Sequence, residues 1–327
     1  MIQSIYEVSV IVVTYNPVWE KYRRTIISII KQKHIKVEVI LCDDGSKTDN
    51  LEQIKSLMEE CSFIDYKIVK NKDNVGTVKN LFSGLEVAEG AYIYAISPGD
   101  YLYDENVLHD LYVFAMKDNK PIVFGDAVYY QDYDTRVMLA QGVNALPFNV
   151  NVFNQDVNMK KQFLGFMLCG NYILGATFFR RRDVALKYMS KIIGICKYVE
   201  DTSSSAYALA DNVQHFHYNK YVVWYECETG ISNNKNEKWT SLLEKDYAAC
   251  YELLKRDFQE KKYVYNVASI KLMDSKKDKL VYLLKNDCWL IGYWLYLSIY
   301  KRFKSRMIHQ HKINDGMMKF LYEEMEE

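Results

Sequence analysis

The chain has 327 residues, of which 49% are hydrophobic, and such a chain buries the core of one large domain or of two smaller ones. Its 42 basic residues balance its 42 acidic residues, so no overall field attracts nucleic acid. The seven cysteines include no C-x-x-C pair, and the N-terminus lacks the basic and apolar regions of a signal peptide. These features predict a cytoplasmic protein with buried thiols.

The first third of the chain alternates between strand and helix periodicity, which is the pattern of strands wound with helices. Runs rich in β-branched or apolar residues predict buried strands at 8–13, 37–42, 66–70, 92–96 and 121–125. Asn16 and Pro17 predict the cap and first turn of the helix after the first strand, and Asp104 predicts a later cap. The predicted fold is therefore α/β, a Rossmann-like, open and mostly parallel sheet with helices on both faces.

Three polar turns follow strands of this predicted sheet, at 14–17, 43–46 and 97–100. Ligands of open α/β sheets bind beyond the carboxyl ends of the strands, so the three turns together indicate one binding site. Helix capping is the alternative for any one of them alone. The chain contains neither G-x-G-x-x-G after the first strand nor G-x-x-x-x-G-K-[ST]. A nucleotide bound at this edge must therefore be held by side chains and turn amides.

Five segments of the chain share a further pattern in their order and spacing. They are VSVIVVTYN at 8–16, CDDGSKTDN at 42–50, the long segment 74–102, GATFFRRRD at 175–183 and VED at 199–201. Over roughly residues 8 to 232 the chain thereby resembles the inverting glycosyltransferases of family 2, which have the GT-A fold. The resemblance implies that the edge of the sheet binds a nucleoside diphosphate sugar, and a uridine nucleotide in particular.

The resemblance also implies which residues contact the nucleotide. Tyr15 packs on the base, and the backbone around Val13 contacts the edge of the base. Asp43 and Asp44 meet the uracil imide and the ribose, and Asp44 is favoured for the base because it lies at the turn. Lys79 stands in GTVKN, where arginine is usual in the family, and keeps the charge without the bidentate geometry. A helix cap for the two aspartates and a solvated surface lysine are the alternatives.

The family usually carries D-x-D-D after the fourth strand, where a carboxylate binds a divalent cation, and this chain carries SPGD at 97–100. Ser97 and Gly99 stand in place of two aspartates, so Asp100 is the expected ligand of Mn²⁺ or Mg²⁺. A hard cation that is bound mostly by water and phosphate needs only one or two carboxylates. Gly99 is expected beside the nucleotide, where it lets the backbone turn enough to bring Asp100 to the cation.

An inverting transfer needs a base that faces the acceptor hydroxyl, and a carboxylate is the simplest solution. Glu200 and Asp201 lie at a predicted helix start, where Asp201 matches the base of the family and Glu200 its usual companion. An acidic first turn stabilised by the helix dipole is the alternative. The chain has no Q-x-x-R-W, the motif of processive members. It is therefore expected to add a single sugar to a glycan, a lipid-linked saccharide or a glycoprotein in surface polysaccharide or glycoconjugate assembly.

From residue 233 the composition shifts to Lys, Glu, Tyr and Leu at helical spacing, which predicts a domain 1–232 and a helical extension 233–327. The longest uncharged run, 288–300, is shorter than the roughly 20 residues that span a bilayer. Residues 288–314 contain no acidic residue and include the basic run KRFKSRMIHQHK. This pattern predicts peripheral attachment to the inner face of an anionic membrane, or a helix that docks on the core or on another subunit, and these alternatives remain open.

Two rival functions also remain open. A sugar-phosphate nucleotidyltransferase has a related fold, but the chain lacks the G-x-G-T-R loop of that class after its first strand. A catalytically inactive scaffold subunit that binds nucleotide sugars is favoured by the depleted D-x-D-D motif and by the large helical extension. Release of nucleoside diphosphate from the donor distinguishes the enzyme from the scaffold.

Overall fold

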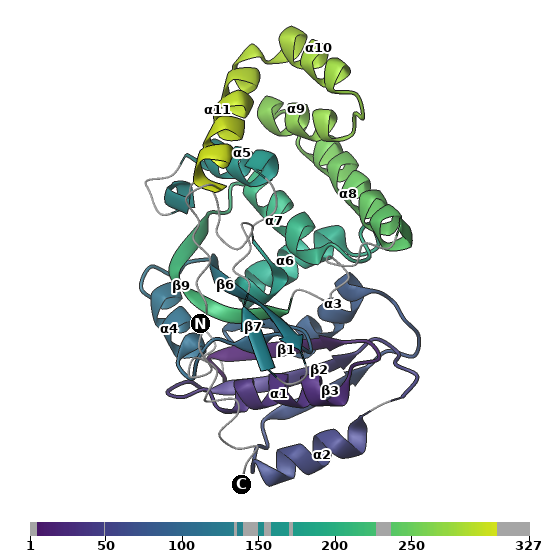
Figure 1. Ribbon diagram of the computed structural model, residues 1–327, viewed down its shortest axis with the longest axis vertical. Helices are drawn as coiled ribbons and strands as arrows, with labels where there is room; N and C mark the ends of the chain where they lie inside the picture. Colours follow the sequence, from purple (N-terminus) through teal and green to yellow (C-terminus); the bar gives the residue numbers. More distant parts are fainter. Residues whose placement is uncertain are drawn as a thin grey trace.

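A computed structural model describes most of the chain. The described residues are 5–48, 50–133, 136–139, 150–153, 158–169, 173–226 and 237–305. The sheet and its flanking helices occupy one end of the long axis, and a group of helices from the C-terminal part of the chain occupies the other (Figure 1). Among the described residues, no helix combines the length and the apolar character needed to cross a membrane.

The strands of the described residues form one continuous sheet. They are β1 (Val8–Thr14), β2 (Val37–Asp43), β3 (Tyr66–Lys70), β4 (Tyr92–Ile96), β5 (Tyr101–Leu102), β6 (Ile122–Tyr133), β7 (Arg136–Leu139), β8 (Phe178–Arg181) and β9 (His215–Glu226). Their order is β3-β2-β1-β4-β8-β6-β9-β5, and β7 pairs with β6 off this path. The four strands β3, β2, β1 and β4 pair in parallel, whereas β8 is antiparallel to both β4 and β6. The sheet is therefore parallel in its first half and mixed beyond β4.

Helices cover both faces of this sheet. The helices of the described residues are α1 (Trp19–Ile30), α2 (Leu51–Glu60), α3 (Thr77–Val87), α4 (Val107–Met116), α5 (Met159–Cys169), α6 (Arg182–Ile192), α7 (Glu200–Ala210), α8 (Glu237–Asp257), α9 (Lys262–Lys271), α10 (Lys276–Asn286) and α11 (Cys288–Ser305), with 3-10 turns η1 (Val150–Phe153) and η2 (Gly175–Thr177). Those that cover the two faces of the sheet are α1, α2 and α4 on one side and α3, α6 and α7 on the other. The α/β fold predicted from the alternating periodicities is confirmed. The four predicted parallel strands agree with β1 to β4 to within one residue, and the predicted strand 121–125 is the beginning of the longer β6.

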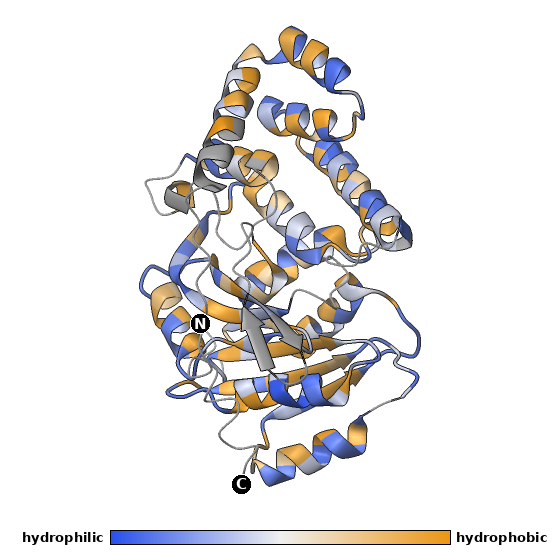
Figure 2. Cartoon of the chain, viewed as in Figure 1, coloured by the Kyte–Doolittle hydropathy of each residue, from blue (hydrophilic) through white to orange (hydrophobic). Residues whose placement is uncertain are grey.

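Two hydrophobic clusters lie on the two faces of the sheet, because alternate residues of a strand point to opposite sides. On one face Val10 and Val12 of β1 pack with apolar residues of α1, α2 and α4. On the other face Ile11 packs with residues of α3, α6 and α7. All three β1 side chains are fully buried, and Figure 2 shows the central strands as largely hydrophobic. This double burial explains why the central strands are rich in β-branched residues.

Two predicted helix caps are wrong. The helix α1 begins at Trp19, after the predicted cap at Asn16 and the proline that follows it. Asn16 instead has a positive φ of 47° and its N–H donates to Ser46 Oγ at 2.7 Å, so it joins the turns after β1 and β2. The helix α4 begins at Val107, and Asp104 Oδ1 accepts a backbone N–H before the helix starts. In both cases the polar side chain closes a turn between elements.

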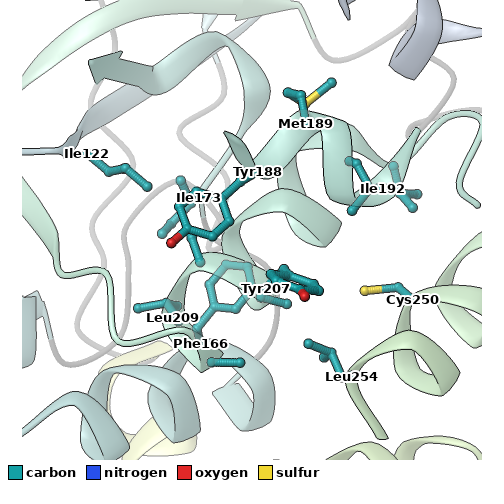
Figure 3. Packing of buried hydrophobic residues seen from close by; sticks show 14 of the residues in the cluster. Ile122, Phe166, Ile173, Tyr188, Met189, Ile192, Tyr207, Leu209, Cys250 and Leu254 are labelled. Atoms are coloured by element: carbon teal, nitrogen blue, oxygen red, sulfur yellow. The ribbon is translucent and has the colours of Figure 1, made fainter. Parts of the chain in front are cut away.

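The C-terminal helices pack directly on the α/β part of the molecule. Cys250 and Leu254 of α8 lie in the same cluster as Tyr207 and Leu209 of α7 (Figure 3). The predicted helical character beyond residue 233 is confirmed for α8 to α11. The predicted boundary at residue 232 lies outside the described residues, as does the part of the segment 288–314 after residue 305. The core shared by the two parts shows that α8 contributes to the packing behind α7.

Candidate functional site

The carboxyl ends of β1 and β2 form one end of a polar edge. The two strands run in parallel register with Thr14 opposite Asp43, and both residues line a pocket that also includes Ser46 and Lys70. Tyr15, the next residue after β1, is 50% exposed and follows Thr14 of the pocket lining in the chain. The predicted base contact requires an exposed aromatic ring of this kind.

The turn after β2 is held by its own aspartate. Asp43 Oδ1 accepts the N–H of Ser46 at 3.2 Å and also the Ser46 hydroxyl proton. Because Ser46 Oγ in turn accepts the N–H of Asn16, the two predicted nucleotide turns form one hydrogen-bonded unit. The structure thus places Val13, Tyr15 and Asp43 at one edge, while their contacts with a nucleotide stay predictions.

Asp44 lies beneath the loop that precedes α3 and is only 4% exposed. Its Oδ1 accepts the N–H of Val75 at 2.8 Å, and its Oδ2 accepts the N–H of Gly76 at 2.9 Å. Burial raises the pKa of this carboxyl, and the two backbone hydrogen bonds oppose the rise. The carboxylate therefore anchors the loop, and a direct contact between Asp44 and the base stays a prediction.

A contact between two loops joins this edge to the predicted catalytic residues. The N–H of Val78, in the first turn of α3, donates to the backbone carbonyl of Lys197 at 3.0 Å. A Cβ placed on Gly76 would come within 2.3 Å of the Lys197 side chain, so the two loops touch at a glycine. Lys79 is exposed one residue further along α3, with no ion pair among the described residues. Two lysines therefore lie near this junction, of which the sequence pattern indicated only Lys79.

Glu200 and Asp201 are the first two residues of α7, as predicted, and both are partly buried. Asp201 Oδ1 accepts the Thr202 hydroxyl proton at 3.1 Å. Burial raises the pKa of Glu200, and the negative charge of Asp201 raises it further. Burial also raises the pKa of Asp201, but hydrogen bonds from Thr202 oppose the rise. The two raised pKa values favour one proton shared by the pair, and the hydrogen bonds from Thr202 favour the charged form of Asp201.

Arg180 supplies positive charge to this carboxylate pair. Its side chain is 4% exposed on β8, and a guanidinium N–H donates to Ser204 Oγ at 3.4 Å, one turn into α7. Its positive charge lowers the pKa of both Glu200 and Asp201. Arg180 Nε has no hydrogen-bond partner among the described residues. The sequence shows only that three arginines follow the apolar residues of GATFFRRRD, and this pattern does not distinguish Arg180 from its two neighbours.

The helix α8 contributes to the site from beyond the predicted domain boundary. Asp246 is 8% exposed, and its Oδ2 accepts the backbone N–H of Lys197 at 2.8 Å and that of Tyr198 at 2.5 Å. This carboxylate fixes the loop that leads into α7. No local pattern in the sequence indicates that contact, because the two segments are 49 residues apart.

The predicted metal ligand, Asp100, is buried in the turn between β4 and β5. Asp100 is 8% exposed, and its Oδ1 accepts the N–H of Glu226, the last residue of β9, at 3.0 Å. The Glu226 carboxylate is 5% exposed and forms an ion pair with Lys21 of α1. Burial, with a smaller contribution from the charge of Glu226, raises the pKa of Asp100 to about 8. The Lys21 ammonium group thus already neutralises the Glu226 carboxylate beside Asp100.

This arrangement does not fit the predicted divalent cation. The described residues hold no group of three or more His, Cys, Asp or Glu side chains that is arranged to bind a metal. Asp100 is directed at the backbone of β9, and a cation at Glu226 would have to displace Lys21. Cation binding by Asp100 therefore stays a prediction that this geometry does not support, and no reaction step below depends on it.

Position 99 requires glycine because of its backbone conformation and because the Glu226 carboxylate lies close to it. Its φ is +101°, and a Cβ at this position would lie 2.4 Å from Glu226 Oε2. Gly194 has a similar φ of +76° but no atom within 4 Å of such a Cβ, so it reports the backbone cost alone.

We expect Gly194→Ala to lower the free energy of unfolding by about 1–2 kcal/mol, the cost of a left-handed backbone. Gly99→Ala should cost clearly more, because it must also displace the carboxylate that pairs with Lys21. Chemical denaturation of the two variants measures the difference. Equal losses would show that the contact with Glu226 is relieved at no cost.

The fold matches solved glycosyltransferases. Residues 1–349 of Staphylococcus aureus TarS, in complex with UDP, match with a TM-score of 0.56 and 15% identity, over 92% of this chain and 89% of that chain. The mannosyltransferase PcManGT from Pyrobaculum calidifontis, in complex with GDP-Man and Mn²⁺, matches with a TM-score of 0.55 and 12% identity, over 92% and 86%. At these identities the similarity shows the fold, which is that of a GT-A-like glycosyltransferase.

The sequence match identifies the family. The family model described as glycosyl transferase family 2 matches residues 9–185, more than half of the chain, and the chain therefore belongs to this family. GlyG from Streptococcus pneumoniae is 30% identical over 128 residues, which are 39% of this chain and 41% of GlyG. An uncharacterised glycosyltransferase of Rickettsia felis is 29% identical over 152 residues, 46% of this chain and 24% of that protein. The chain thus spans less than half the length of these relatives.

Proposed function

We propose that this protein transfers one sugar, with inversion, from a uridine diphosphate sugar to a glycan, a lipid-linked saccharide or a glycoprotein. We call the polar edge at the carboxyl ends of β1 and β2 the nucleotide edge. The observation that carries the proposal is the hydrogen bond from the Val78 N–H to the Lys197 carbonyl. This bond brings the nucleotide edge beside the loop that leads to Glu200 and Asp201. TarS has been seen with UDP and with UDP-GlcNAc, which favours a uridine donor here. Family membership supports sugar transfer as the reaction.

In the proposed reaction the acceptor oxygen attacks the anomeric carbon from the side opposite the diphosphate. The new glycosidic bond forms as the bond between the anomeric carbon and the diphosphate oxygen breaks, and the electron pair leaves with the nucleoside diphosphate. The acceptor proton passes to the carboxylate of Asp201. The hydrogen bonds from Thr202 favour the charged form of Asp201, which accepts this proton. Lys79 and Lys197, at the junction of the two loops, offset the charge of the departing diphosphate.

Calorimetry with UDP tests the nucleotide edge. Asp43→Asn removes a charged acceptor that lines the pocket, and loss of a hydrogen bond to a charged group costs about 1.5–3 kcal/mol, or about 10- to 100-fold in affinity. Asp43 is preferred to Asp44 for this test because Asp44 anchors two buried amides. Repeating the titration with Mn²⁺ and with a chelator shows whether a divalent cation takes part.

Asp65→Asn is the matched control for this titration. Asp65 is exposed and precedes β3 at the opposite end of the strand from the pocket, where it accepts the Tyr6 hydroxyl proton. The control should bind UDP as the unmodified protein does. Unchanged affinity in Asp43→Asn, or an equal loss in both variants, would remove the proposed nucleotide edge.

The scaffold function remains the second candidate, because Ser97 and Gly99 stand where the family usually has two aspartates. A scaffold binds the donor without breaking it. Incubation with UDP-sugars and an assay for released UDP therefore distinguishes the two functions, and release above the uncatalysed background supports the enzyme.

A further inference from the structure

The helices α10 and α11 carry an unusual share of the exposed apolar surface. Of the fifteen large apolar side chains that are exposed among the described residues, seven belong to these two helices. They are Leu280, Val281 and Leu284 of α10 and Trp289, Leu295, Tyr296 and Ile299 of α11. Scattered exposed apolar residues are normal, but a concentration of this kind marks an interaction surface. We call these seven residues the apolar face.

On α11 the exposed residues form one stripe along the helix. Trp289, Tyr296 and Ile299 follow each other at the spacing of a single helical face and are 52%, 53% and 60% exposed. Leu290 on the other side is fully buried in the hydrophobic cluster that extends to the sheet. The helix is therefore anchored by one side to the protein, and its opposite side presents aromatic and aliphatic side chains to the surroundings.

Basic residues outnumber acidic residues in the segment that contains the apolar face. Residues 276–305 contain seven basic and two acidic residues. Lys276, Lys277 and Lys285 are exposed on α10 and form no ion pair among the described residues. One of the two acidic residues, Asp287, forms a hydrogen bond at the start of α11, where its Oδ1 accepts the N–H of Leu290 at 3.3 Å. Apolar side chains flanked by unpaired lysines are the combination that binds an anionic lipid surface.

We propose that the apolar face of α10 and α11 docks on an anionic membrane surface. Charge complementarity favours lipid over a second copy of the chain, because two such faces would bring like charges together. Aromatic side chains with a polar group, such as Trp289 and Tyr296, are suited to the boundary between headgroups and acyl chains. The two helices lie at the end of the molecule opposite α2, so docking there leaves the nucleotide edge accessible (Figure 1). The proposal does not depend on the identity of the donor or the acceptor.

Vesicle sedimentation with the full chain tests this proposal. The unmodified protein should bind vesicles of phosphatidylcholine mixed with phosphatidylglycerol and should not bind vesicles of phosphatidylcholine alone. Added salt should weaken the binding, because it screens the lysines. The double variant Leu295→Glu with Ile299→Glu should lower the binding by about tenfold or more, because it places charges where the apolar layer contacts the helix.

The double variant Val113→Glu with Met116→Glu is the matched control, because these residues are 53% and 49% exposed on the distant helix α4. It should bind vesicles as the unmodified protein does, and circular dichroism should show that both variants are folded. Failure of the unmodified protein to bind anionic vesicles, or an equal loss in the control, would overturn the proposal. A dimer in solution that only the Leu295 and Ile299 substitutions dissociate would assign the face to a second copy instead.

Discussion

Asp201→Asn should lower the rate of sugar transfer by about 10²–10⁴-fold, the usual contribution of a general base. The substitution keeps the size of the side chain and the oxygen that accepts the Thr202 hydroxyl proton, so α7 should begin as before. It removes the charge that accepts the acceptor proton. UDP affinity should not change, because the nucleotide edge is built by the ends of β1 and β2. Transfer kinetics and calorimetry on the same preparation measure both quantities.

Asp183→Asn provides the matched control for this variant. Asp183 lies in the first turn of α6, as Asp201 lies in the first turn of α7, but its side chain is 65% exposed and paired with Arg181. The control should keep full transfer activity. If Asp201→Asn transfers sugar within a fewfold of the unmodified rate, Asp201 is not the base. If UDP binding fails together with transfer, the residue has a structural role instead.

The parallel half of the sheet was predictable because its signals are local. Strands that are buried on both faces need nearly continuous apolar runs, and β1 and β2 have such runs, rich in β-branched residues. The positions of Tyr15 and Asp43 follow from where these runs end. In the mixed half the run 121–125 predicted the beginning of β6, but no local signal predicts how its strands pair. There β6 pairs with β9, and the partners Ile122 and His215 are far apart in the sequence, so the pairing depends on the tertiary fold.

In the candidate site, too, local features were predictable from the sequence and contacts between distant segments were not. The sequence pattern identified Glu200 and Asp201 as a helix start, and the structure confirms that placement. It did not identify Asp246, because this carboxylate reaches the loop before α7 from a helix that composition assigns to a separate extension. It also treated Asp100 as an open ligand, since the run SPGD does not show that β9 covers this turn. Burial is set by distant segments, and local patterns do not report it.

Arg180→Gln should shift the acid limb of the pH–rate profile to higher pH. A nearby positive charge favours the charged form of a carboxyl, and the Arg180 charge lowers the pKa of both Glu200 and Asp201. Without the guanidinium the pKa of Asp201 rises, so a larger fraction of the base is protonated near neutral pH. Transfer should therefore fall at neutral pH and recover as the pH is raised.

Arg180→Lys separates this electrostatic role from a structural one. Arg180 is buried and its guanidinium contacts Ser204, so Arg180→Gln is expected to be less stable, and unfolding must be measured beside the kinetics. The lysine variant keeps a positive charge in the same buried position and should keep the acid limb near its original pH, even if the lost contact with Ser204 lowers stability. A rate that falls equally at every pH in both variants would mean that Arg180 acts through packing. A shift in the glutamine variant alone would establish that the guanidinium charge keeps Asp201 ionised for proton transfer.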